Sequence, residues 1–183
     1  MMKATGIVRR IDDLGRIVIP KEIRRTLHIR ESDPLEIFTD REGQVILKKY
    51  SPIGEMTTFA KQYAESLAAV SGCYVVISDR DQVIAVSGGV KKEYIGRRIS
   101  HELEEIMEQR RTVNTDTDNV KTITIIDGQD VSDMGQIIFP IICEGDVIGS
   151  VVLMSKTEKQ QVSDTEKKLV SVAADFLGRQ MES

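Results

Sequence analysis

The sequence predicts an α+β protein built from two domains. In residues 1–50, short apolar segments separated by turn residues follow the order strand, strand, helix, strand, strand. Proline and glycine within residues 51–54 interrupt all hydrophobic periodicity, which predicts a boundary. Longer helical periods then alternate with apolar strand segments. We therefore expect one domain over residues 1–52 and a second over residues 55–183.

The first domain is expected to pair with a second copy of itself. Its predicted elements are a strand at 5–12, a strand at 16–19, a short helix at 20–27 and a hairpin formed by 35–38 and 44–47. Ile17, Val18 and Ile19 are apolar at consecutive positions, which is typical of a strand buried on both faces. A unit of about 50 residues without a disulfide or a metal buries too little surface to cover both faces of such a strand by itself. A homodimer resolves the conflict, because the second copy covers what one copy cannot.

The second domain is expected to open and close with helices. Residues 55–71 carry an apolar stripe that includes Met56, Phe59 and Leu67. The elements expected next are strands at 73–78 and 82–86, a helical region at 93–111 with Ile99, Leu103, Ile106 and Met107 inward, a polar loop at 112–119, and strands near 121–126, 136–143 and 147–154. The final helix, residues 163–182, begins with a capping-box pattern and is apolar on two sides. We expect it to pack on its own sheet and on a second subunit.

The charge of the chain is unevenly distributed. The net charge is −4, but residues 1–50 carry 11 lysines and arginines against 8 aspartates and glutamates. Within residues 1–30 the net charge is +5, and six of the eight cations are arginines. Arginine suits phosphate oxygens and guanine edges, so this segment is expected to face a polyanion. A solvated charged surface is the alternative explanation of the pattern.

Composition argues against a secreted scaffold, a metalloenzyme and a membrane protein. Cys73 and Cys143 cannot form a disulfide framework or a four-ligand zinc site by themselves. Both lie in apolar strand patterns and are expected to be buried, and His28 and His101 are expected at the surface or as caps. No apolar run approaches about 20 residues and no apolar signal segment opens the chain, so we expect a cytoplasmic protein. We expect no catalytic residues, no metal and no cofactor.

Four segments of the first domain carry a resemblance to a known family: residues 3–10 (Lys-Ala-Thr-Gly-Ile-Val-Arg-Arg), 12–20 (Asp-Asp-Leu-Gly-Arg-Ile-Val-Ile-Pro), 22–27 (Glu-Ile-Arg-Arg-Thr-Leu) and 46–50 (Ile-Leu-Lys-Lys-Tyr). With them, the domain resembles the AbrB-type swapped-hairpin transition-state regulators. In that family two chains interlace their hairpins into one dimeric β-barrel that binds DNA. The resemblance therefore implies the same dimer for this chain.

The resemblance also implies which side chains contact DNA, namely Arg9, Arg16, Arg24 and Arg25. Lys3 and Lys21 are weaker candidates for phosphate contacts. Arg10 alternates to the opposite face of its strand and is expected to pair with Asp12 or Asp13. A wide arginine surface with few base-reading groups predicts that DNA shape contributes to site choice.

The second domain has the order helix, strand, strand, helix, three strands, helix, and the sequence Gly-Ser-Val-Val-Leu at 149–153 in a central strand. In these features residues 55–182 resemble a GAF domain. The resemblance implies a central antiparallel sheet with flanking helices, and self-association through the helices at 55–71 and 163–182. A small-molecule effector is left open, and no pocket residues are predicted.

As a whole, the chain resembles a family of sporulation transcription regulators of endospore-forming bacteria. The resemblance implies a regulator that binds duplex DNA, as an activator or a repressor, and forms a tetramer if its two domains pair with different chains. The alternative is an antitoxin-like interaction module, because swapped-hairpin domains also occur in antitoxins that neutralise a toxin with a disordered acidic tail. Limited proteolysis distinguishes the two hypotheses: rapid degradation of residues 56–183 would favour the antitoxin-like module, and resistance would favour the regulator.

Overall fold

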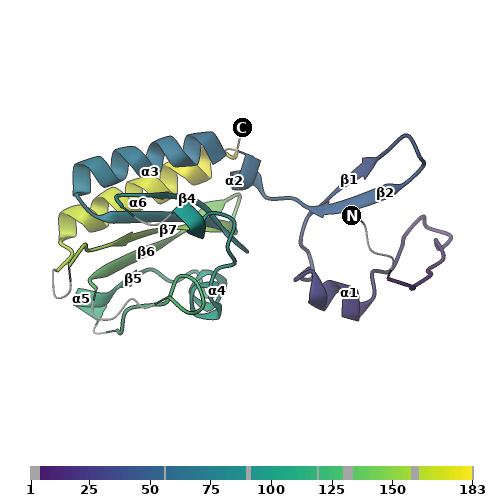
Figure 1. The fold of residues 1–183 in the computed structure, drawn as a ribbon, viewed down its shortest axis with the longest axis horizontal. Coiled ribbons are helices and arrows are strands. Elements are labelled where there is room, and N and C mark those ends of the chain that lie inside the picture. The colour runs from purple at the N-terminus through teal and green to yellow at the C-terminus, as the bar shows by residue number, and fades with distance from the viewer. Residues whose placement is uncertain are drawn as a thin grey trace. The chain divides into compact units, whose positions relative to one another are not determined.

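The computed structural model of the chain describes residues 5–55, 57–89, 92–118, 120–129, 134–157 and 161–182. The chain forms two compact units, Met1–Tyr50 and Ser51–Ser183 (Figure 1). Three predictions fall on residues outside the described ranges: the phosphate contact of Lys3, the inward position of Met56 and the loop residue Asn119. No helix in the described ranges combines the length and the apolar composition that a bilayer span needs.

The described residues 5–50 of the first unit form one short helix and one hairpin, at the places where the sequence predicts them. Its elements are α1 (Lys21–Thr26), β1 (Leu35–Thr39) and β2 (Val45–Lys49), and the two strands pair antiparallel. Helix α1 begins directly after Pro20, whose fixed φ suits a helix start. It ends in a Schellman motif, in which the Ile29 amide donates to the Arg24 carbonyl at 2.8 Å. His28 takes the left-handed position of this motif, with a φ of 52°.

The segments 5–12 and 16–19, which the sequence predicts as strands, are not strands in the single chain. They flank a turn in which the Asp12 amide donates to the Arg16 carbonyl and the Gly15 amide to the Asp12 carbonyl, each at 3.0 Å. Gly15 has a φ of 76°, which glycine adopts without steric cost. A strand needs a partner along its length. Among the described residues, no further backbone pairs with these segments, and the strand prediction is wrong for one chain by itself.

In its described part, the first unit has no hydrophobic core of its own. Pro20 is the one buried residue within the described residues 5–50. The large apolar side chains that are exposed instead are Ile7, Val8, Ile11, Leu14, Ile17, Val18, Leu27, Ile37, Phe38, Val45, Ile46, Leu47 and Tyr50. Val8 is 85% exposed and Val18 is 70% exposed. A soluble monomer rarely exposes so much apolar surface.

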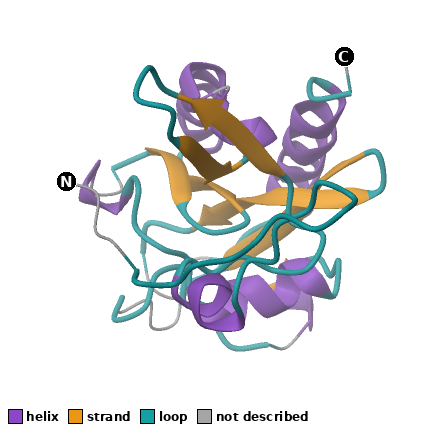
Figure 2. Cartoon of the chain, turned by 90° about the vertical axis from the view of Figure 1, so that its right-hand side faces the viewer, coloured by secondary structure: helices purple, strands orange, loops and turns teal. Residues whose placement is uncertain are grey.

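The second unit is built on one five-stranded antiparallel sheet with the order β4-β3-β7-β6-β5, which confirms the predicted central sheet. The strands are β3 (Tyr74–Asp79), β4 (Val83–Ser87), β5 (Val113–Asn114), β6 (Gln136–Cys143) and β7 (Asp146–Met154). The longer helices are α3 (Thr57–Ser71), α4 (His101–Glu108) and α6 (Asp164–Arg179), and the short ones are α2 (Pro52–Glu55), η1 (Lys92–Tyr94) and α5 (Thr115–Asp118). Helices α3 and α6 lie on one face of the sheet and α4 on the other (Figures 1 and 2).

Both faces of this sheet are buried, and alternate residues of each strand supply the two cores. On β3, Val75 and Ile77 pack under α3 and α6, whereas Val76 packs on the side of α4. Because both faces are covered, the central strands are apolar at consecutive positions. The inward residues predicted for α4 are buried, with Leu103 at 0% and Ile106 at 2% exposure.

The helix predicted over residues 93–111 is shorter than expected. Gly96 has a φ of 79° and interrupts the helical period before residue 101. The Ser100 side chain then accepts a hydrogen bond from the Leu103 amide and caps the start of α4. Helix α4 therefore extends only over His101–Glu108, and the residues before it form a single 3₁₀ turn and a loop.

The strand predicted near residues 121–126 does not form, and the edge of the sheet is β5, where a polar loop was predicted. The buried Gln136 side chain accepts from the Ile123 amide at 2.8 Å and donates to the Ile123 carbonyl at 2.9 Å. One side chain thus satisfies both backbone groups that a neighbouring strand would otherwise satisfy. The strand prediction for 121–126 is wrong because the pattern of apolar residues cannot show that a side chain, rather than a strand, bonds this backbone.

Helix α6 has the capping box and the two apolar sides that the sequence predicts. The inner side is fully buried and consists of Val170, Ala173 and Leu177. The outer side is open to solvent in the single chain, with Val172 61% exposed and Phe176 39% exposed. Phe176 also contacts Phe59 and Tyr63 of α3, with ring centroids 5.8 and 5.7 Å apart. The outer side of α6 is therefore continuous with a partly exposed aromatic cluster on α3.

Candidate nucleic-acid interface

The first unit holds the four arginines that are predicted to bind DNA. Arg9 and Arg16 lie on either side of the turn at Gly15, and Arg24 and Arg25 are consecutive residues of α1. Arg9, Arg16 and Arg25 are exposed, whereas Arg24 is half-buried. Within the described part of the chain, no ion pair occupies Arg9, Arg24 or Arg25. Three guanidinium groups are therefore available to an anionic ligand.

Asp12 orients the fourth arginine. Its carboxylate accepts hydrogen bonds from the Arg16 amide at 2.7 Å, from Arg16 Nε at 2.9 Å and from the Leu14 amide at 3.0 Å. These bonds, led by the one from the Arg16 amide, lower the pKa of Asp12. The pairing predicted for Arg10 with Asp12 or Asp13 is wrong. In the described residues Asp12 forms its ion pair with Arg16, and Arg10 forms no ion pair.

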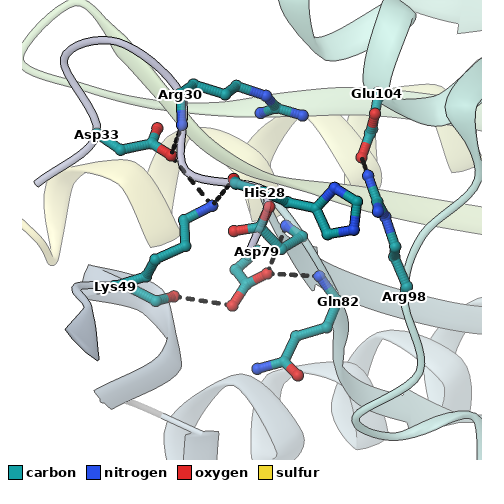
Figure 3. A network of polar contacts seen from close by, with 10 residues as sticks. His28, Arg30, Asp33, Lys49, Asp79, Gln82, Arg98 and Glu104 are labelled. Carbon is teal, nitrogen blue, oxygen red and sulfur yellow. Dashed lines mark hydrogen bonds and ion pairs between the residues drawn. The ribbon is translucent and has the colours of Figure 1, made fainter. Parts of the chain in front are cut away.

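A second polar cluster of the first unit connects β2 to the end of α1 (Figure 3). Lys49 Nζ donates to the His28 carbonyl at 2.9 Å and pairs with Asp33 Oδ2 at 3.1 Å. The same Asp33 oxygen accepts from the Arg30 amide at 2.8 Å. The Asp33 side chain is 3% exposed and that of Lys49 is 24% exposed. Sequence reasoning missed this cluster, although strand alternation places Lys48 and Lys49 on opposite faces.

The second unit has a buried carboxylate whose role is structural. Asp79 Oδ1 accepts from the amides of Asp81 and Gln82, each at 2.7 Å, and closes the turn between β3 and β4 (Figure 3). Asp79 Oδ2 accepts from Ser51 Oγ at 3.0 Å, and Ser51 Oγ accepts from the Gly54 amide at 3.1 Å. The carboxylate thus ties the start of the unit to its sheet.

The two thiols and the exposed histidine are the remaining titratable groups of interest in the second unit. Cys73 is buried as predicted, but Cys143 is only half-buried because it ends β6 next to an exposed hairpin turn. Burial raises the pKa of both thiols, which disfavours the reactive thiolate. The His101 side chain is 80% exposed, as expected for a surface residue. In the described ranges, no three His, Cys, Asp or Glu residues are grouped to hold a metal ion.

The chain is 56% identical over 181 residues to stage V sporulation protein T of Bacillus subtilis (strain 168), and the match covers 99% of each chain. The family profile described as "Stage V sporulation protein T C-terminal, transcription factor" matches residues 55–182. The chain belongs to the stage V sporulation protein T family. The recognition drawn from the sequence motifs is thereby confirmed.

The two units of this stage V sporulation protein T family member have separate relatives. Transition state regulatory protein AbrB of Bacillus subtilis (strain 168) is 65% identical over 51 residues, which are 28% of the chain and 52% of AbrB. The profile "Antidote-toxin recognition MazE, bacterial antitoxin" matches residues 8–55. The GAF domain from Acinetobacter phosphoenolpyruvate-protein phosphotransferase is 12% identical, with a TM-score of 0.52 over 70% of this chain and 87% of that one. This likeness confirms the GAF-like fold.

Proposed function

We propose that this member of the stage V sporulation protein T family is a transcription regulator that binds duplex DNA and controls sporulation genes, as an activator, a repressor or both. The observation that carries the proposal is the exposed arginine surface of the first unit. It lies in the segment that is 65% identical to AbrB over 51 residues. The family profile of the second unit, described as a transcription factor, supports the same function.

The proposal assigns DNA contact to a dimer of the first unit with interlaced hairpins. The exposed apolar side chains of this unit support a dimer, because a second copy would remove them from water. Segments 5–12 and 16–19 would then gain strand partners from the other chain. Two-fold symmetry would present each arginine twice to the duplex.

Four arginines of each chain would contact the duplex: Arg9, Arg16, Arg24 and Arg25. Guanidinium groups bind phosphate oxygens and the acceptor edge of guanine, so they supply affinity and base recognition together. The pair between Arg16 and Asp12 does not oppose this role. It is exposed, with the Arg16 side chain at 68% and the Asp12 side chain at 36%, so water and salt screen the pair and it stabilises the fold little. A phosphate therefore exchanges readily for Asp12.

The proposed role of the second unit is self-association through α3 and α6. Val70 on α3 is 74% exposed and Val172 on α6 is 61% exposed, and the same two helices carry the aromatic cluster of Phe59, Tyr63 and Phe176. A second copy would cover these side chains, and pairing of the two units with different chains would give a tetramer. A small-molecule effector of the GAF-like unit would act by changing the placement of the DNA-binding dimers.

The antitoxin-like alternative has support in the profile that matches residues 8–55. It requires a disordered acidic tail, whereas the residues described after position 50 form a sheet with two buried cores. We therefore favour transcription regulation without catalysis, in agreement with the raised pKa of both thiols.

The test compares two single-arginine variants of the full chain by fluorescence anisotropy with a duplex selected in vitro by the parent protein. Arg25→Ala removes an exposed guanidinium of α1 and is expected to weaken binding about tenfold or more. Arg41→Ala removes an exposed arginine of the β1–β2 turn and is the matched control, expected to bind like the parent. A folded Arg25→Ala protein with parental affinity would contradict the assignment.

A further inference from the structure

The direction of α1 relative to the hairpin depends on the connection formed by residues 28–34. This connection begins within the Schellman motif, at His28, and leads directly into β1. Strand pairing places Lys49 opposite Leu35, the first residue of β1. The Tyr50 amide extends the pairing by donating to the Pro34 carbonyl at 3.0 Å. The last residue of β2 therefore lies beside the connection rather than beside the hairpin turn.

From this position the Lys49 ammonium group contacts residues near both ends of the connection 28–34. Its Nζ donates to the carbonyl of His28, two residues after α1, and pairs with Asp33, two residues before β1 (Figure 3). Asp33 also accepts from the Arg30 amide, so one lysine and one carboxylate close the loop on itself. The carboxylate is nearly buried, so loss of the ion pair with Lys49 would be costly at this place. The connection would then have to rearrange.

We propose that Lys49 is a positioning residue for DNA binding: its ammonium group holds the connection 28–34 so that α1 presents Arg24 and Arg25 in one fixed orientation. The proposal rests on the DNA contacts assigned above to these two arginines. Lys49 itself does not contact the duplex in this proposal, because its Nζ is engaged by His28 and Asp33. The alternative hypothesis is that Lys49, as a basic residue of a DNA-binding unit, contacts a phosphate directly.

The two interpretations predict different salt dependences. A lysine that neutralises a phosphate contributes about 0.9 to the slope of log affinity against log salt, or about 1.8 for two copies. A positioning lysine leaves the slope unchanged and lowers the affinity by the fraction of molecules in which α1 is correctly oriented. Lys48 is the matched control, because it is exposed, lies one residue away and carries the same charge.

The experiment uses the full chain and the selected duplex. For Lys49→Met we expect binding at least about tenfold weaker with an unchanged salt slope, together with faster hydrogen exchange of the Ile29 amide, whose bond to Arg24 closes α1. Lys49→Arg is expected to restore binding and protection, and Lys48→Met to leave Ile29 protected. Lys49→Met with parental affinity, or with a slope reduced by about 1.8 and a protected Ile29 amide, overturns the proposal.

If circular dichroism shows that Lys49→Met does not fold, Asp33→Asn decides instead, because it removes the charge but keeps the size of the side chain. Weaker binding with an unchanged slope supports the proposal, and parental binding rejects it. A separate result would show that the proposed DNA contacts of Arg24 and Arg25 are themselves wrong. If folded Arg24→Ala and Arg25→Ala both bind like the parent, the arginine assignment is wrong, whatever Lys49 does to Ile29 exchange.

Discussion

The affinity of the protein for duplex DNA is expected to fall steeply with salt. If Arg9, Arg16, Arg24 and Arg25 of two chains each neutralise a phosphate, the slope of log affinity against log salt is about −7. Affinity then decreases about 10⁴-fold between roughly 50 and 200 mM salt. The exposed pair of Arg16 with Asp12 determines how shallow this slope could be. If Arg16 stayed with Asp12 in the complex, six contacts would remain and the slope would be about −5.

Anisotropy titrations at four or more salt concentrations measure this slope directly. Arg25→Ala is expected to bring it to about −5, since two contacts are lost, while Arg41→Ala leaves it near −7. A parental slope near zero would refute the electrostatic reasoning altogether. An equal change in the two variants would show that net charge, rather than the arginine surface, governs binding.

Two further predictions concern the second unit. Val172→Glu places a charge on the exposed side of α6 and is expected to halve the mass of the expected tetramer in light scattering. Lys121→Glu is the control and is expected to leave the mass unchanged, because Lys121 is exposed and its neighbours Val120 and Ile123 pack on the α4 side of the sheet. A parent that is only a dimer rejects the arrangement. Hydrogen bonding from Ser163 lowers the pKa of Glu166, so the capping box stabilises the fold above the unfolded pKa of about 4.3, and this contribution is lost as the pH falls through the folded pKa. Ser163→Ala is accordingly expected to cost about 1 kcal/mol in denaturant unfolding at neutral pH and less at pH 3, and an equal loss at both would contradict the linkage.

The elements that the sequence predicts correctly are those with local signals. Pro20 sets the start of α1, and the capping box sets the start of α6. The segments 5–12 and 16–19 have strand patterns, but pairing depends on a partner that one chain does not contain. The error at 121–126 has another cause, because the Gln136 side chain replaces the expected strand neighbour. Patterns of apolar residues report burial and cannot report which group takes a backbone hydrogen bond.

The candidate site divides in the same way. The arginines could be identified from the sequence because their residue type and their position beside a turn or on a helix are local properties. The contact between Lys49 and Asp33 could not be identified, since it depends on the pairing of Leu35 with Lys49 and on the path of the connection after α1. Asp12 is a third case, because Arg10 and Arg16 are both near it in sequence and the turn at Gly15 brings Arg16 to its carboxylate.

The absence of a core among the described residues 5–50 has a consequence for how the protein responds to its own abundance. If folding of this unit and association of two chains are one event, the population of DNA-competent molecules follows mass action and rises more steeply than the amount of protein made. Dilution would unfold the unit as well as separate it. Synthesis rate alone would then act as a threshold for target occupancy, before any small molecule is sensed.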